Sequence, residues 1–329
     1  MSKNSIVCAG IDTGKHKLDV AIRGVKGQLF ELLVENTADG HKVLSAWLRE
    51  HKVKRVGIEA SGGYEQAVVL YLRKKKFVVV VFQPKQVRAY ATFNLQIAKN
   101  DKLDAALIAD CTAAIKEINA PPDERVTAFA KRMTFIDQIT EDVARIRTRC
   151  ESCRDKQILH YWREEIARLE RRKKAEIKAL AAAIREHGDL SKRLDLIESV
   201  DGVGLLTAVA ILVRMPEIGT VTREEVAALA GLAPYDHESG NHVGERHIKG
   251  GRGRLRKSLY CAALPASMRW NHQLVSMYRR FIAAGKLHKV ALVACARKLL
   301  IFVNTVVERG SPWEKSRATA KFELGLRAA

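Results

Sequence analysis

Hydrophobic residues recur with two different spacings in the first third of the chain. Short apolar runs predict β-strands at residues 5–12, 17–24, 28–36, 54–60 and 77–84, and Pro84 is expected to end the last, buried strand. Residues 41–51 and 64–76 carry apolar side chains at the spacing of a helix. Strands that alternate with helices in this way predict an α/β sheet covered on both faces.

Helical spacing dominates the rest of the chain. A helix from residue 104 is expected to stop before Pro121 and Pro122, which mark the clearest domain boundary. Beyond it, six apolar residues follow a helical seam with a gap at Lys173: Trp162, Ile166, Leu169, Ile177, Leu180 and Ile184. The seam predicts a coiled coil or a long antiparallel hairpin, although a plain surface helix in a bundle fits it about as well. We expect three domains, at residues 1–120, 121–193 and 194–329, the last mostly α-helical.

The charge of the chain indicates a class of partner. Among 329 residues, 57 are Lys or Arg and 37 are Asp or Glu, so the formal net charge is +20. This excess favours nucleic acid, because neutralising phosphates releases counterions; simple solubility is the alternative. Six scattered cysteines, no signal-peptide pattern and no membrane-length apolar run predict a cytoplasmic protein without a membrane partner. Cys150 and Cys153 form a lone CxxC without the second pair that a zinc site needs.

Four acidic residues stand where an α/β sheet places its chemistry. Asp12 and Glu59 each end an apolar strand, and Asp101 and Asp104 share one face of a helix because they are three residues apart. Carboxylates gathered at one edge repel one another unless a cation lies among them, and oxygen ligands suit Mg²⁺ or Mn²⁺. Each acid alone also fits an ordinary solvated position. Asp19 is a competing acid that this set leaves out.

Two glycine-containing segments of the last third are candidates for contact with nucleic acid. Gly202 and Gly204 permit a tight turn of helix-hairpin-helix form, and the helix after it would offer N–H groups to a phosphate; a purely structural turn is about equally expected. Further on, a Gly-rich segment carries six cations suited to phosphate contacts: Arg246, Lys249, Arg252, Arg254, Arg256 and Lys257. A solvated basic loop is the alternative. Ser239 lies in this segment before Gly240, and its local pattern alone assigns it no role.

Five segments together resemble one known family. They are GIDTGKHKLDV, IEASGGYE, NDKLDAALIA, VDGVGLLTAVAIL and LAGLAPYDHESGNHVGERHIKGGRGRLRKSLY, and they span nearly the whole chain. In this order they resemble the DEDD insertion-sequence transposases of family one-hundred-ten, which are related to the Piv and MooV DNA invertases. Asp12, Glu59, Asp101 and Asp104 match the four acids of that family. Asn100 departs from a common Thr, at a position that is not one of the acids.

The resemblance implies a complete transposase. It implies a RuvC-like ribonuclease H fold, a linking coiled coil and a C-terminal transposase domain. It implies a DNA transposase or recombinase with Mg²⁺ (or Mn²⁺) at the four acids and with Ser239 as a nucleophile on DNA. The implied partners are donor and target DNA, a non-coding bridge RNA, and further copies of the chain in a homodimer or homotetramer, in which the acids of one subunit meet Ser239 of another. The implied setting is the prokaryotic cytoplasm, at the nucleoid during reaction.

Three other functions remain to be weighed against this one. A RuvC-like Holliday-junction resolvase or a site-specific DNA invertase would use the same acids without an RNA. A non-catalytic basic nucleic-acid-binding protein would not need all four acids, which are present. An actin-like ATPase would need a second Gly-rich phosphate strand, and the sequence has none that we recognise.

Overall fold

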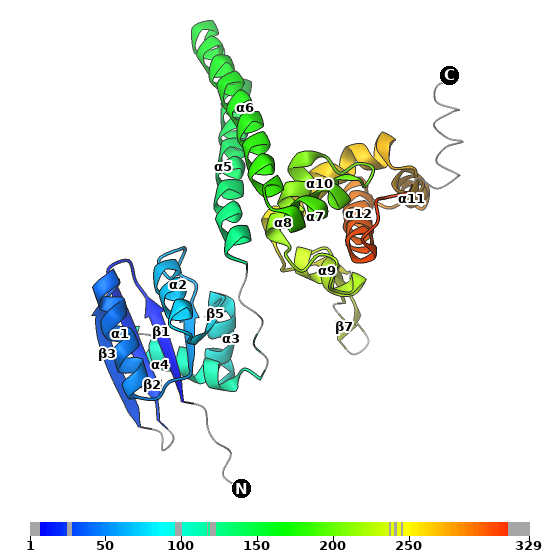
Figure 1. Cartoon of the computed structure of the whole chain (residues 1–329). Coiled ribbons are helices and arrows are strands. Elements are labelled where there is room, and N and C mark those ends of the chain that lie inside the picture. Colours follow the sequence, from blue (N-terminus) through cyan, green and yellow to red (C-terminus); the bar gives the residue numbers. More distant parts are fainter. Residues whose placement is uncertain are drawn as a thin grey trace, which may run out of the picture. The chain divides into compact units, whose positions relative to one another are not determined.

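The structure is a computed structural model that divides into two compact units, Met1–Pro121 and Pro122–Ala329 (Figure 1). It describes residues 7–24, 28–95, 101–116, 118, 123–236, 238–239, 242–244 and 246–314, without the side chains of residues 101–103, 238–239 and 242–243.

The first unit is built on a five-stranded mixed sheet with the order β3-β2-β1-β4-β5. Its strands are β1 (Cys8–Thr13), β2 (Lys17–Arg23), β3 (Leu29–Glu35), β4 (Arg55–Glu59) and β5 (Val78–Phe82). β1, β2 and β3 form an antiparallel meander, whereas β4 runs parallel to β1 and β5 parallel to β4. This order and these directions are those of a ribonuclease H-like domain, so the predicted fold class is confirmed.

Helices cover both faces of this sheet, as the alternating pattern predicted. On one face, α1 (Ala38–Glu50) and α2 (Gln66–Lys74) bury their apolar side chains against β1, β2 and β4. On the other face lie α3 (Pro84–Phe93) and α4 (Asp101–Ala114), which form a separate cluster with β5. Each face therefore has its own apolar core.

One expectation about the end of the sheet was wrong. β5 is an edge strand rather than a fully buried one, because only one neighbour pairs with it, and Val78 and Val81 are exposed. The strand ends before Pro84, as expected, and Pro84 also begins α3, where a proline at the first helical position costs no hydrogen bond.

The second unit begins with a long helical hairpin. α5 (Glu124–Ser152) and α6 (Lys156–Arg185) lie side by side, joined by a short connection, and Arg147 Nη2 contacts Glu170 Oε1 at 2.8 Å across them (Figure 1). Of the predicted seam, Leu169, Leu180 and Ile184 are buried. The base of this hairpin shares one hydrophobic cluster with the helices that follow. The division into three domains, at residues 120 and 193, stays a prediction.

The remaining helices of the second unit pack around α8 and α12. The full set is α7 (Gly188–Glu198), α8 (Leu205–Arg214), α9 (Arg223–Ala230), α10 (Gly253–Pro265), α11 (His272–Ala283) and α12 (His288–Arg309), with a π-helical turn η1 (Ala266–Trp270) between α10 and α11. Among the described residues, α12 alone has the length and hydropathy of a membrane-crossing helix, and its apolar side chains lie in the shared core with those of α8.

A small β-region interrupts the helices of the second unit, where only helices and Gly-rich connections were expected. Its strands are β6 (Pro234–Tyr235), β7 (Glu238–Ser239), β8 (His242–Val243) and β9 (His247–Ile248). β6 pairs with β9, and β7 pairs with β8, so the segment folds back on itself as a nested hairpin.

Candidate active site and nucleic-acid interface

Asp12 and Glu59 share one edge of the sheet in the first unit. β1 and β4 are parallel, and their register sets Gly10 beside Gly57. Asp12 lies two residues after Gly10 in β1, and Glu59 lies two residues after Gly57 in β4. Because side chains alternate between the faces of a strand, both carboxylates lie on the same face as the two glycines, at the carboxyl ends of their strands.

Helix α4 packs closely against this face where the strands carry glycine. A Cβ atom on Gly10 would lie 2.1 Å from the carbonyl oxygen of Ala105, and one on Gly57 would lie 1.9 Å from Thr112 Oγ1. A side chain at Gly10 would therefore meet the helix backbone, and one at Gly57 would meet the side chain of Thr112. The position of α4, and of the acids on it, depends on this close contact with β1 and β4.

The direction of α4 brings its first turn to the edge that holds the two strand carboxylates. Ala105 lies over the middle of β1, whereas Arg55 at the start of β4 donates hydrogen bonds to the carbonyl oxygens of Thr112 and Ile115 near the other end of the helix. The helix thus runs from the carboxyl ends of the strands back toward their beginnings. Its first turn contains Asp101 and Asp104.

Three of the four acids have described side chains, and all three are half-buried: Asp12, Glu59 and Asp104. Among the described side chains, no three His, Cys, Asp or Glu residues lie close enough together to hold a metal ion. The side chain of Asp101 lies outside the described residues. A set made only of carboxylate oxygens at one sheet edge fits a hard cation such as Mg²⁺ or Mn²⁺ in its chemistry.

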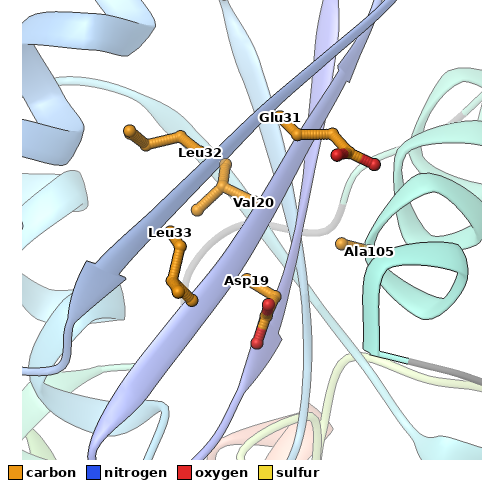
Figure 2. Close-up of a pocket in the computed structure, with 6 residues that line it drawn as sticks. All are labelled: Asp19, Val20, Glu31, Leu32, Leu33 and Ala105. Carbon is orange, nitrogen blue, oxygen red and sulfur yellow. The ribbon is translucent and has the colours of Figure 1, made fainter.

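Asp19 also lies on this face, although it was left out of the predicted site. The register of β1 and β2 sets Asp19 directly opposite Asp12, a pairing with about 5 Å between Cβ atoms. Lys17 Nζ lies 3.1 Å from Asp19 Oδ2 and offsets part of the repulsion. Asp19, Glu31 and Ala105 line a cavity of about 230 Å³ (Figure 2). No pattern within β2 indicates this face, which follows from the register of β2 with β1.

The two loops that follow the strand acids are tied together by Asn36. Its Nδ2 donates to the carbonyl oxygens of Gly14, after β1, at 3.0 Å, and of Tyr64, after β4, at 3.1 Å. Its Oδ1 lies 2.9 Å from His41 Nε2, and because an amide oxygen only accepts, this nitrogen carries the proton. Burial lowers the pKa of His41, which favours the neutral ring. Nothing in the local sequence of Asn36 marked it.

The loop after Glu59 is also organised by a carboxylate of its own. Glu65 Oε2 accepts hydrogen bonds from the backbone N–H groups of Ser61 at 3.0 Å and Gly63 at 2.9 Å. Partial burial by itself raises the pKa of Glu65, but the hydrogen bonds outweigh it and the pKa lies below its usual value. Glu65 is therefore a charged structural residue of this loop.

Two buried cysteines of the first unit, Cys8 and Cys111, are poorly suited to chemistry. Burial raises the pKa of Cys111 to about 11, and the negative charges of Asp110 and Glu59 add to this effect. Burial also raises the pKa of Cys8, against the opposing charge of Arg55. Both thiols stay protonated at neutral pH, so neither is a ready metal ligand or nucleophile.

The predicted helix-hairpin-helix turn exists in the second unit, and its two glycines differ. Gly202 has a φ of +95°, and a Cβ atom there would lie 2.4 Å from the Cβ of Ala266. Gly204 is exposed, begins α8 as its N-cap, and has open space where a Cβ would stand. Gly202 is therefore required by the fold, whereas Gly204 leaves the start of α8 open to a ligand.

Ser239 lies in a short paired strand within the Gly-rich segment. It belongs to β7 and pairs with His242 of β8, and two residues, Gly240 and Asn241, separate the partners in sequence. Its side chain, together with His237, lies outside the described residues. Ser239 thus stands at the inner end of the nested hairpin.

Two of the predicted phosphate contacts, Arg252 and Arg256, are each held by two hydrogen bonds within the chain. Arg252 binds Glu217 with both terminal nitrogens, at 2.8 and 2.6 Å. Burial by itself raises the pKa of Glu217, but the pairing with Arg252 lowers it by more, so the pKa lies below its usual value. Arg256 Nη1 donates to the carbonyl oxygens of Gly250, at 2.7 Å, and Gly231, at 3.3 Å. Both arginines hold the Gly-rich segment against the helices.

The other four cations are more accessible. Arg246 Nε lies 2.5 Å from Asp236 Oδ1, which joins the two arms of the nested hairpin while both side chains stay exposed. Arg254 is half-exposed, and its Nη1 lies 3.8 Å from Asp137 Oδ2. The exposed lysines of this set are Lys249 and Lys257.

Two solved structures of RuvC resemble part of the chain. One, titled "T. thermophilus RuvC in complex with Holliday junction substrate", is 17% identical, covers 32% of this chain and 92% of its own, and has a TM-score of 0.27. The other, titled "Thermus thermophilus RuvC structure", is 21% identical, covers 35% and 84%, and has a TM-score of 0.24. At these scores the fold assignment rests on strand order and register, not on this likeness.

Similarity in sequence is more extensive. The pilin gene-inverting proteins of Moraxella bovis and Moraxella lacunata are each 25% identical over 333 aligned residues, which cover 96% of this chain and 99% of theirs. A protein of insertion element IS110 from Streptomyces coelicolor is 33% identical over 132 residues, 39% of this chain and 32% of that protein.

Two family models match the chain. The first lies mostly in the first unit and extends into the second, and the second lies wholly in the second unit. Residues 9–156 match a transposase model of the DEDD type of IS110, and residues 194–279 match the model described as Transposase IS116/IS110/IS902 family. Together they take in well over half of the 329 residues. The chain therefore belongs to the IS110 family of DEDD transposases, a class of DNA-recombining enzymes.

Proposed function

We propose that this enzyme cleaves and rejoins the DNA strands of an insertion sequence, with Asp12, Glu59, Asp101 and Asp104 as one catalytic set and Ser239 as the nucleophile. The observation that carries the proposal is the placement of three separate chain segments, β1, β4 and the first turn of α4, at one edge of the sheet. Carboxylates gathered in this way are costly for stability alone, which favours a role in catalysis.

A divalent cation, Mg²⁺ or Mn²⁺, would be held by these four carboxylates. When bound, such an ion lowers the pKa of an attacking hydroxyl and stabilises charge on the leaving oxygen of a phosphodiester. The contribution of the chain is to hold its carboxylates charged and in place. The packing of α4 on Gly10 and Gly57, and the hydrogen bonds of Asn36 to both neighbouring loops, support that role.

The proposed step at Ser239 exchanges one phosphodiester for another. The serine Oγ forms a bond to the scissile phosphorus and the bond from phosphorus to a deoxyribose oxygen breaks. That oxygen leaves as a hydroxyl and takes up the proton that the serine releases. Rejoining reverses the exchange with a new DNA hydroxyl, so no nucleotide triphosphate is consumed. A hydroxyl needs activation by a base or a metal to act in this way, which links Ser239 to the four acids.

We also propose that donor and target DNA are selected by a bridge RNA, and that the enzyme works as a homodimer or homotetramer. The net charge of +20 supports a large polyanionic partner. A second candidate function is site-specific DNA inversion without an RNA. The full-length similarity to the pilin gene-inverting proteins favours that alternative. The two functions differ in whether ribonuclease treatment of the purified enzyme removes its activity.

The proposed function predicts a strict need for metal. Purified enzyme with its co-purified RNA should recombine a plasmid pair bearing the element ends and a target only when Mg²⁺ or Mn²⁺ is present. Excess EDTA should reduce recombination below detection, because carboxylates alone cannot stabilise the leaving oxygen, and added Mg²⁺ should restore it. Prior ribonuclease treatment should also stop the reaction. Full activity in EDTA would contradict the metal site. Full activity after ribonuclease treatment would contradict the bridge RNA and favour site-specific DNA inversion without an RNA.

Asn36 offers a test of how the site is positioned. We expect Asn36→Ala to lower the cleavage rate about 10- to 100-fold, as is usual when a partner that orients catalytic loops is lost. The reason is that the loops after Asp12 and Glu59 lose their shared hydrogen-bond donor. The metal concentration needed for half-maximal activity should rise as well, which a purely structural loss would not produce.

The matched control for this test is Asn94→Ala. Asn94 Nδ2 donates to the carbonyl oxygen of Tyr90 at the end of α3, and the residue is exposed. This variant should cleave at the wild-type rate. Wild-type cleavage and metal dependence in Asn36→Ala would show that Asn36 does not orient the site.

A further inference from the structure

One long part of the second unit has no acidic residue in its sequence. From Arg246 to Val307 there is no Asp or Glu. Lys and Arg recur throughout: Arg246, Lys249, Arg252, Arg254, Arg256, Lys257, Arg269, Arg279, Arg280, Lys286, Lys289, Arg297 and Lys298. Ordinary surfaces mix both signs of charge, so this composition indicates a surface for a polyanion that extends well beyond the Gly-rich segment.

A π-helical turn, η1, interrupts the helices of this region. Pro265 at the end of α10 has no N–H group for the helical ladder, and the next turn widens, with Asn271 N–H donating to the carbonyl oxygen of Ala266 at 2.9 Å. Such turns occur often at functional sites. The widened turn changes the direction in which residues 266–270 present their side chains.

The fold holds η1 firmly against the helix-hairpin-helix turn. The buried Asn271 donates from Nδ2 to the carbonyl oxygen of Asp201 at 3.0 Å. Gly202 leaves no room for a Cβ atom beside Ala266. The two turns therefore form one rigid platform, with the open start of α8 at Gly204 in the same turn as Asp201.

A large aromatic side chain is exposed on this platform. Trp270, the last residue of η1, is 59% exposed, and the guanidinium of Arg269 lies 5.3 Å from the centre of its ring. Met268 and Leu264 nearby in sequence are exposed as well. An exposed tryptophan is costly in water, and one beside an arginine within an acid-free region matches the chemistry that stacks a nucleobase.

We propose that Trp270 and Arg269 form a stacking site for an unpaired base of a nucleic-acid strand, whose phosphates follow the basic surface of α10 and α11. The partner is single-stranded DNA or RNA, because a base in a duplex has no free face for the indole ring. The inference rests on the proposed function only in taking nucleic acid as the substrate. Charge complementarity favours this occupant over a protein of mixed charge, because α10, η1 and α11 carry cations and no acid that would pair with basic groups of such a partner.

The test compares binding of single strands and duplexes by variants of the full-length enzyme. Fluorescein-labelled 20-nucleotide DNA, RNA of the same sequence, and the DNA duplex serve as probes. Trp270→Ala should weaken binding of a single strand about 5- to 100-fold and binding of the duplex by less than twofold, because only an unpaired base stacks. Trp270→Phe should keep most of the affinity. Tyr161→Ala, which removes a similarly exposed ring from α6, should leave both unchanged.

The salt dependence of binding tests the charged half of the site. Arg269→Ala should reduce the slope of log affinity against log salt by about 0.7 for single strands, as for one lost phosphate contact, whereas Trp270→Ala should not change it. The two DNA and RNA probes decide which strand the site prefers.

Several outcomes would overturn the inference. Wild-type binding of single strands by Trp270→Ala, or an equal loss for single strands and duplex, would show that no unpaired base stacks there. If Trp270→Ala fails to fold, intrinsic fluorescence decides the matter: a single strand should quench wild-type emission, and the quenching should be absent from Trp270→Phe. Failure of the proposed function is distinguishable, because an enzyme that cleaves no DNA would still show the Trp270-dependent preference for single strands.

Discussion

Alanine at Asp12, Glu59 or Asp104 should lower DNA cleavage about a thousandfold or more. That loss corresponds to roughly 4 kcal/mol of the several kcal/mol that a carboxylate-held metal contributes to the transition state. All three side chains are half-buried at the edge of the sheet, outside the two apolar cores, so the variants should remain folded. The cleavage rate on a labelled DNA substrate is the measurement, together with calorimetric titration of Mg²⁺.

Asp39→Ala is the matched control for these variants. Asp39 lies on α1 in the same unit, is highly exposed, and contacts only Lys42 among the ion pairs of its helix. This variant should cleave at the wild-type rate. Asp101→Ala belongs with the test set, because the helix direction places its backbone at the same edge. Normal cleavage by two or more of the four variants would remove the DEDD assignment from this chain.

Ser239→Ala should abolish strand exchange, with a loss as large as that of the acid variants, while binding of DNA and RNA persists. The hydroxyl is the proposed acceptor of the scissile phosphorus, and no other group of an alanine variant could replace it. Wild-type enzyme on nicked DNA should give a protein–DNA adduct on a denaturing gel, and Ser239→Ala should give none. Ser239→Cys is expected to keep a trace of activity, since a thiolate is a competent nucleophile.

Ser258→Ala controls for the loss of a hydroxyl in the same basic region. Ser258 Oγ donates only to the carbonyl oxygen of Arg254 within α10, so its removal should leave exchange unchanged. A different result would reassign the chemistry. If wild type forms no adduct and Ser239→Ala recombines normally, the four acids must act on water and a DNA hydroxyl, and Ser239 is a residue of the nested hairpin alone.

The sheet and the edge that carries the acids could be predicted from sequence because short-range pattern decides them. Short apolar runs located every strand of the first unit within a few residues, and the positions of Asp12 and Glu59 at strand ends followed. Asp19 was missed because its face depends on register with β1, which no pattern within β2 reveals. The helix that begins at Pro84 was not predicted, because a proline suits both the end of a strand and the first turn of a helix.

Long-range pairing explains the individual contacts that the sequence could not reveal in either unit. Arg252 has the composition of a phosphate contact, but its partner Glu217 stands 35 residues away. Asn36 orients two loops that only the folded sheet brings together. The strand pair at Ser239 could not be predicted, because β7 and β8 have only two residues each, too few to show an alternating pattern.

The shared core at the base of the helical hairpin has a practical consequence for following motion. α5 and α6 are held there by apolar packing and by the Asp137–Arg214 ion pair, so we expect the hairpin and the C-terminal helices to move together. Thirty residues of α6 extend about 45 Å at roughly 1.5 Å per residue, so a rotation of about 10° at the base displaces the tip by about 8 Å. Cys150 and Cys153 lie near that tip and are partly exposed. A fluorophore attached there would move much farther than the base of the hairpin, so it would report small rotations of the second unit during a reaction cycle.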